Sequence, residues 1–141
     1  MSAQNMKFKD NSFDFIICKD SFHHFKDPVK VLKEMYRVLK IGGYIYSVDL
    51  RRDIPNEIFY QITQLASELN IDNAILYFIS HNASYTIKEM ETIVEKAGIK
   101  KFNISSPTID KNFLREYDLK SEQFLTASDY LKDKWTLIIK K

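Results

Sequence analysis

The feature that most constrains the fold is a strand–helix–strand pattern in the first third of the chain. Residues 13–18, Phe-Asp-Phe-Ile-Ile-Cys, form a β-branched and aromatic run typical of a strand. Asp27 and Pro28 then supply a helix N-cap and first helical position. Apolar residues follow at helical spacing, and the Gly42-Gly43 pair predicts a stop after Lys40. Residues 44–49 resemble another strand, so the pattern predicts two parallel strands joined by a crossover helix.

The consecutive apolar residues Phe15, Ile16 and Ile17 indicate a strand that is buried on both faces, as in a parallel sheet. Further elements are predicted downstream: a helix after Pro55, a short apolar helix over 74–79, a helix from a Thr86–Glu89 capping box to Gly98, an exposed strand over 100–105, one or two short helices between Lys111 and Tyr130, and a last strand over 135–139. No repeat or linker interrupts them, so residues 1–141 are expected to form a single unit.

Composition excludes several classes of protein. The chain has 3 glycines in 141 residues, and neither glycine-rich phosphate-loop motif can be written in it, so a self-contained loop of that kind is excluded. A single cysteine, Cys18, excludes an internal disulfide and fits a cytoplasmic setting. The net charge of +2 with scattered basic residues argues against a nucleic-acid partner. No apolar stretch is long enough to span a membrane, so no membrane partner is expected.

Three stretches carry a resemblance to a known family. They are Asp10-Asn-Ser-Phe-Asp-Phe-Ile-Ile-Cys18, His23-His-Phe-Lys-Asp-Pro28 and Leu32-Lys-Glu-Met-Tyr-Arg-Val-Leu-Lys-Ile-Gly-Gly43. Together they resemble the middle of a class I S-adenosylmethionine (SAM) dependent methyltransferase, of the branch that acts on small molecules and quinones. Ile41 stands where the family usually has proline.

The resemblance implies an α/β fold, namely a partial Rossmann-like methyltransferase sheet flanked by helices. This sheet would comprise the last four strands, mostly parallel with an antiparallel terminal strand. The family's glycine-rich cofactor loop and the acidic residue that binds ribose would lie upstream of residue 1. The chain therefore looks like the C-terminal half to two-thirds of a methyltransferase domain, truncated before residue 1.

The resemblance also implies SAM as the cofactor. By position, Ala3 and Gln4 would lie beside its adenine ring, and Cys18 and Lys19 would face its methionine part. The carboxyl ends of parallel strands are where open α/β sheets bind ligands, which supports the second placement independently. The alternative is that Cys18 is a small buried apolar residue and Lys19 a solvated loop charge.

Three further side chains are candidates for catalysis. His23 and His24 could act as acid or base, or could only pack the turn before the helix at Pro28. Asp49, at the end of the second strand, could meet a substrate or cap the following loop. With His81 the only other histidine, the chain offers no recognised metal-ligand spacing, so no metal is expected.

Aromatic residues gather where the family places its substrate-covering helices. Phe59, Tyr60, Tyr77 and Phe78 could line a pocket for a small methyl acceptor, although core packing at helical spacing is the alternative. The expected activity is therefore methyl transfer from SAM to a small-molecule acceptor, in a chain that is incomplete for that reaction.

The second hypothesis is a catalytically silent association module. Without the family's first strand, Phe13–Ile17 would become an apolar sheet edge, which invites pairing with another chain. A homodimer through this edge is expected, formed by antiparallel pairing with its copy. A separate polypeptide that supplies the missing strands is the other arrangement.

Overall fold

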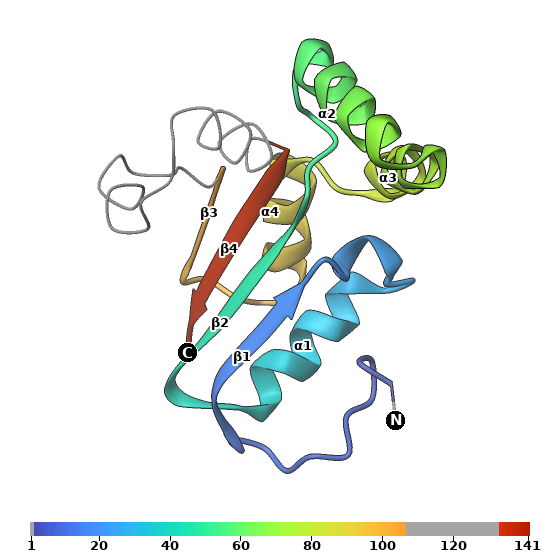
Figure 1. The fold of residues 1–141 in the computed structure, drawn as a ribbon. Coiled ribbons are helices and arrows are strands. Elements are labelled where there is room, and N and C mark those ends of the chain that lie inside the picture. Colours follow the sequence, from blue (N-terminus) through green and yellow to red (C-terminus); the bar gives the residue numbers. More distant parts are fainter. Residues whose placement is uncertain (1, 107–132) are drawn as a thin grey trace, which may run out of the picture.

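The computed structural model describes residues 2–106 and 133–141, which form a four-stranded sheet with helices (Figure 1). The elements follow the order β1 (Phe13–Lys19), the 3-10 helix η1 (Phe22–His24), α1 (Pro28–Val38), β2 (Leu39–Leu50), α2 (Asn56–Leu69), α3 (Ile71–Ala83), α4 (Ile87–Lys96), β3 (Phe102–Ser105) and β4 (Lys134–Lys140).

The strand order is β1-β2-β4-β3. β1 and β2 are parallel, whereas β4 runs antiparallel to both of its neighbours, β2 and β3. The predicted fold class is confirmed: the described sheet has four strands, of which only the last in the chain runs against the others.

Local sequence signals explain where the two covering helices begin. The side chain of Asp27 caps α1 by accepting a hydrogen bond from the backbone N–H of Lys30 at 2.9 Å. In α4, the Thr86 hydroxyl accepts from the Glu89 backbone, and the Glu89 carboxylate accepts from the Thr86 backbone. Both bonds of the predicted capping box are therefore present.

The predicted end of the first helix is wrong. α1 ends at Val38, and β2 begins at Leu39 rather than at Tyr44. The reason is that Leu39 already pairs with Phe13 of β1, and the Gly42 N–H donates to the Lys141 carbonyl at 2.8 Å. The two glycines thus lie inside a long strand instead of terminating the helix.

Among the elements predicted after the second strand, one needs an adjustment of its bounds. The apolar helix expected over 74–79 is longer, from Ile71 to Ala83, because the side chain of Asn70 caps it. α2, β3 and β4 lie where they were expected. The short helices expected between Lys111 and Tyr130 fall outside the described residues.

One face of the sheet carries the core. Trp135, Leu137 and Ile139 of β4 are fully buried together with apolar residues of α1 and α4, such as Leu32 and Met90. Alternate residues of each strand point to this face, so the sheet and its two helices form two packed layers.

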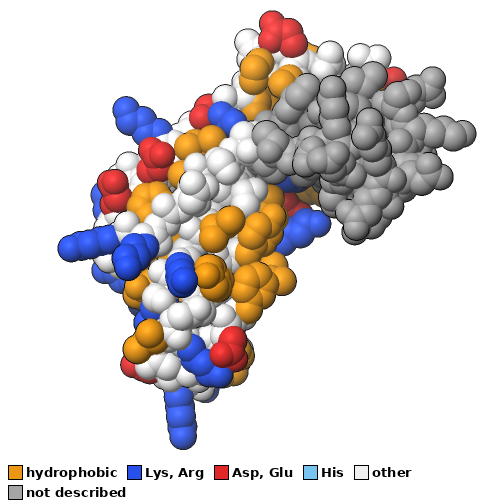
Figure 2. Space-filling view, turned by 90° about the vertical axis from the view of Figure 1, so that its left-hand side faces the viewer, with side chains coloured by type: hydrophobic (Ala, Val, Ile, Leu, Met, Phe, Trp, Pro, Cys, Tyr) orange, Lys and Arg blue, Asp and Glu red, His pale blue; other side chains and the backbone are white. Residues whose placement is uncertain are grey.

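The opposite face of the sheet leaves large apolar side chains exposed. We call Phe15, Ile17, Tyr44, Tyr46 and Ile138 the open face, since neighbouring strands bring them together in register. Figure 2 shows hydrophobic side chains gathered on the molecular surface. The prediction that β1 is buried on both faces is wrong here, because Phe15 and Ile17 are 54% and 64% exposed and β1 is an edge strand.

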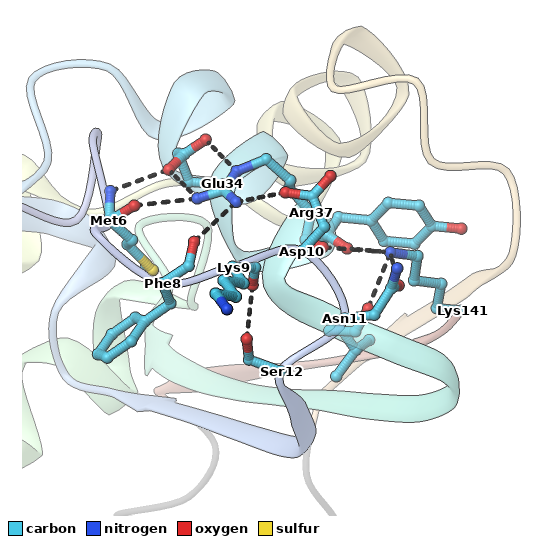
Figure 3. A network of polar contacts seen from close by, with 11 residues as sticks. Met6, Phe8, Lys9, Asp10, Asn11, Ser12, Glu34, Arg37 and Lys141 are labelled. Atoms are coloured by element: carbon cyan, nitrogen blue, oxygen red, sulfur yellow. Dashed lines mark hydrogen bonds and ion pairs between the residues drawn. The ribbon is translucent and has the colours of Figure 1, made fainter.

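Arg37 of α1 fastens the segment before β1 to the helix (Figure 3). Its guanidinium donates to the carbonyls of Met6 and Phe8 and to the carboxylates of Asp10 and Glu34, at 2.6–3.0 Å. The Glu34 carboxylate also accepts from the Met6 N–H, and its bonds with Arg37 lower the pKa of Glu34 to about 2. This network holds residues 6–10 against α1.

Candidate functional site

The candidate site lies where β1 and β2 end. Both strands run toward the same edge of the sheet, where η1 follows β1 and α2 follows β2 after a short connection (Figure 1). The α2–α3 hairpin stands beyond this edge, and α3 contacts η1. Parallel strands therefore bring residues from separate parts of the chain to one place, as ligand sites of open α/β sheets require.

A histidine and an aspartate form the centre of this site. The Nδ1 atom of His23 lies 2.7 Å from Oδ1 of Asp49, and their side chains are only 6% and 1% exposed. Asp49 also accepts from the backbone N–H groups of His23 and Leu50, at 3.1 and 2.7 Å. Because a carboxylate only accepts hydrogen bonds, the Nδ1 atom of His23 carries a hydrogen and donates it to Asp49.

The two adjacent histidines differ in their surroundings. The His24 ring lies 3.9 Å from the His23 ring, measured between centroids, but His24 is exposed. The bond to Asp49 is made by His23 alone of the two. The structure thus separates the predicted pair into one fixed imidazole and one exposed neighbour.

A cavity of about 460 Å³ opens beside the two histidines. The α2–α3 hairpin supplies both apolar and polar side chains to its wall, and the rest comes from η1 and the ends of the strands. Its lining residues are Asp20, His23, His24, Leu50, Ala66, Leu69, Asn73, Leu76, Tyr77, Ser80, Asp133 and Lys134. Its volume suits a small molecule.

A charged cluster of buried Lys134 and Asp133 with exposed Asp20 forms the polar part of the cavity wall. The Lys134 ammonium, 5% exposed, lies 3.5 Å from the Asp20 carboxylate and 3.9 Å from that of Asp133. Burial raises the pKa of Asp133 to about 6, and the Lys134 charge and the Tyr77 hydroxyl oppose this rise only in part. Protonation of Asp133 therefore removes one of the two carboxylate charges that face the Lys134 ammonium.

Sequence reasoning did not identify the Asp20, Asp133 and Lys134 cluster. A signal for two of these residues was present, because Asp133 and Lys134 come directly before or at the start of the last strand. An antiparallel strand begins at the edge where its parallel neighbours end, so the start of β4 lies beside the ends of β1 and β2.

The four predicted cofactor residues lie outside the cavity lining. Ala3 packs against the core and Cys18 lies in it, where burial raises the pKa of its thiol. Gln4 is half-buried in a turn closed between Ser2 and Asn5, and Lys19 is exposed and pairs with Asp20. These four side chains offer one amide, one ammonium and no carboxylate for a ribose, so they do not by themselves fit a whole SAM molecule.

The predicted aromatic residues take different places. The Phe59 ring lies within 6.1 Å of the rings of Tyr77 and Phe78 and 4.6 Å from that of His81, all measured between centroids. Tyr77 lines the cavity, whereas Tyr60 is 67% exposed. Over residues 2–106 and 133–141, no group of three His, Cys, Asp or Glu side chains could hold a metal ion.

We compared the sequence and the fold of this chain with those of known proteins. Residues 1–47 match the methyltransferase domain family. An uncharacterised methyltransferase of Bacillus subtilis, YcgJ, is 44% identical over 48 residues, which span 34% of this chain and 19% of that protein. A demethylmenaquinone methyltransferase of Listeria welshimeri is 42% identical over 48 residues, which span 20% of its length.

The fold extends the likeness beyond residue 47. The whole chain superposes on 62% of a SAM-dependent methyltransferase from Thermotoga maritima, with a TM-score of 0.59 and 22% identity. It also matches 36% of a phosphoethanolamine methyltransferase of Haemonchus contortus solved with S-adenosylhomocysteine, with a TM-score of 0.55 and 18% identity. The chain thus spans less than two thirds of each of these neighbours.

In sequence and in fold, this chain is similar to SAM-dependent methyltransferases. The relation is one of sequence over residues 1–47 and of fold over the length of the chain. The resemblance read from the motifs is confirmed, and so is SAM as the cofactor of the proteins that this chain resembles.

No described helix is long and apolar enough to cross a membrane.

Proposed function

We propose that this chain supplies the acceptor-binding part of a SAM-dependent methyltransferase that acts on a small molecule. The observation that carries the proposal is the cavity of about 460 Å³ at the carboxyl ends of β1 and β2. It lies on the edge of the sheet that serves ligand binding in this fold class, and His23, which lines it, is hydrogen-bonded to Asp49. A reducing, cytoplasmic setting is part of the proposal, supported by a single buried cysteine.

The cofactor would contact Ala3, Gln4, Cys18 and Lys19, which lie outside the cavity lining. Since these residues hold only part of such a molecule, we propose that the 141 residues alone bind SAM weakly. A polypeptide equivalent to the rest of the structural neighbours would complete the site.

Isothermal titration calorimetry of the chain with S-adenosylhomocysteine tests this proposal. We expect no saturation below millimolar ligand for the chain alone. Micromolar binding would contradict the partial site and show that this chain holds the cofactor unaided. A lysate pull-down from the source organism that recovers a glycine-loop methyltransferase segment, and restores binding, would support completion by a second polypeptide.

A second candidate function, self-association, is favoured by the position of β1. This strand lies at the edge of the sheet, and Phe15 and Ile17 project from it into solvent. An unpaired apolar edge can add a strand from another molecule. We propose a two-fold dimer in which Phe13–Ile17 of each copy pairs antiparallel with the other.

Multi-angle light scattering tests the dimer. The Phe15→Lys variant should dissociate at concentrations where the unaltered chain is dimeric, because charged edge residues oppose strand addition. Tyr60→Lys, at an exposed position on α2 away from the sheet, is the matched control and should remain dimeric. An unaltered chain of monomer mass, 16.7 kDa, across the concentration range would overturn the dimer.

A further inference from the structure

We propose that His81 makes the packing of the α2–α3 hairpin depend on pH, so that the hairpin moves away from the sheet edge when the buried imidazole gains a proton. The hairpin supplies much of the cavity wall, namely Ala66, Leu69, Asn73, Leu76, Tyr77 and Ser80. Its movement therefore opens the cavity. This inference goes beyond the proposed function, because it requires neither SAM nor methyl transfer.

The ring of His81 is buried without a hydrogen bond. The residue lies near the C-terminal end of α3 and is 8% exposed, and neither ring nitrogen has a hydrogen-bond partner among the residues that the structure describes. The ring lies 4.6 Å from that of Phe59 on α2 and 6.0 Å from that of Tyr77, measured between centroids. Since both nitrogens of an imidazolium carry a hydrogen, protonation places a charge and two unpaired donors between the two helices.

A fixed positive charge opposes this proton further. Arg52, in the connection between β2 and α2, donates to the Ser84 carbonyl at 2.7 Å and to the Glu89 carboxylate at 2.6 Å. These contacts hold its guanidinium at the base of the hairpin. Burial, and after it the charge of Arg52, lower the pKa of His81 below its ordinary value of 6.5. The imidazole is therefore neutral at neutral pH while the hairpin is packed.

The open hairpin binds the proton more tightly than the packed one. Once the imidazole of His81 meets water, it regains its ordinary pKa, so acid favours the open form. The packed hairpin has its full stability above about pH 6.5 and loses it as the pH falls through the lower pKa of the packed form. At about pH 5.5 the opening equilibrium can change by no more than about tenfold, because an imidazole with a pKa of 6.5 is then protonated by about ten to one.

Other titratable groups face α3 from the elements around it. Asp133, whose pKa is about 6, interacts with the Tyr77 hydroxyl, and the two histidines of η1 lie on an element that α3 contacts. On α2, the carboxylates of Glu57 and Glu68 are exposed. A test of the proposal therefore has to separate His81 from Asp133 and from the η1 histidines.

Hydrogen exchange of the full chain at about pH 5.5 and about pH 7.5, corrected for the intrinsic exchange rates, is the measurement. We expect the protection of residues 56–83 to fall several-fold at the lower pH, within the limit of about tenfold, because local opening exposes these amides. The protection of β2 and α4 should change less. Unchanged protection of the hairpin would overturn the proposal, and so would an equal loss in β2 and α4, which indicates global unfolding.

Three variants assign the effect to one side chain. His81→Phe keeps an aromatic ring beside Phe59 but cannot gain a proton, so it should abolish the pH dependence of exchange in the hairpin. Asp133→Asn and His24→Gln are the matched controls, and both should keep it. Persistence of the dependence in His81→Phe, or its loss in either control, would overturn the assignment to His81.

Histidine NMR of the unaltered chain provides a measurement that does not require a variant to fold. His81 should titrate with a pKa below 6.5, and titration at or above this value would overturn the proposal. Neither experiment involves SAM. A chain that never binds SAM can still show the pH-dependent hairpin, and a chain that binds SAM can fail this test, so the two proposals stand or fall separately.

Discussion

Asp133 shows what burial does to a single carboxyl group. It is fully buried in the wall of the cavity, and its pKa of about 6 lies above its ordinary value of 3.8. The folded state therefore binds this proton more tightly than the unfolded state. The resulting stabilisation is complete below about pH 4 and is lost as the pH rises through about 6.

Replacing Asp133 by Asn should flatten this dependence. Between pH 4 and pH 7 the unfolding free energy of the unaltered chain should fall relative to that of Asp133→Asn by about 2–3 kcal/mol, the equivalent of the shift in pKa. Urea unfolding at a series of pH values measures this difference. The unfolding free energy of the control Asp14→Asn, a change at an exposed position, should vary with pH as that of the unaltered chain does. If the difference in unfolding free energy between Asp133→Asn and the unaltered chain stays constant with pH, the prediction is wrong.

At the level of elements, the β1–β2 pair depends on close backbone approach at one glycine. A Cβ atom on Gly43 would lie 2.7 Å from the Asp14 carbonyl oxygen of β1, whereas one on Gly42 would meet nothing within 4 Å. Gly42 instead has a φ of 82°, in the left-handed region. The adjacent glycines are therefore required for different reasons, one for space and one for conformation.

Alanine substitutions at these two positions form a matched pair. Gly42→Ala should cost about 1 kcal/mol of unfolding free energy, the penalty of left-handed backbone. Gly43→Ala should cost about 1–3 kcal/mol, since a strand must shift, and should also increase amide exchange over residues 13–19. Chemical denaturation with hydrogen exchange measures both. If Gly42→Ala increased amide exchange in β1 as much as Gly43→Ala does, the different roles given to the two glycines would be wrong.

The local elements were predictable because their signals are short-range. The Asp27 cap, the Thr86–Glu89 capping box and the apolar run of the last strand all act within a few residues. The end of α1 was not predictable in this way, because Leu39 and Gly42 bond to residues of β1 and to Lys141. Likewise, His23 and Asp49 were each candidates, but their contact arises from the pairing of two strands and appears only in the folded chain.

Among the residues that the structure describes, the sheet has one face covered by helices and one face with exposed apolar side chains. The open face holds Tyr46 and Ile138 on neighbouring strands, 37% and 41% exposed, beside the apolar edge at Phe15 and Ile17. A contiguous apolar surface of this kind marks an interaction site. Edge and open face together offer a second chain both backbone pairing and apolar contact.

The double variant Tyr46→Thr with Ile138→Thr should reduce self-association, as measured by sedimentation velocity. It should change the unfolding free energy by less than about 1 kcal/mol, because these side chains are already partly in water. Ile45→Thr, on the covered face of the same strand, is the contrast: it should cost about 1–3 kcal/mol by placing a hydroxyl in the core. If the double variant associates as strongly as the unaltered chain, the two copies contact each other through the strand edge alone.

The position of β4 inside the sheet has a consequence for biosynthesis. Residues 134–140 are translated after every other described strand, yet they pair with β2 on one side and β3 on the other. In a growing chain, Ile45 of β2 and the other residues that pack against β4 therefore stay exposed until residues 134–140 leave the ribosome. Pairing between segments so far apart in the sequence is slow to form, so we expect the unpaired β2 edge to be prone to aggregation until β4 joins it.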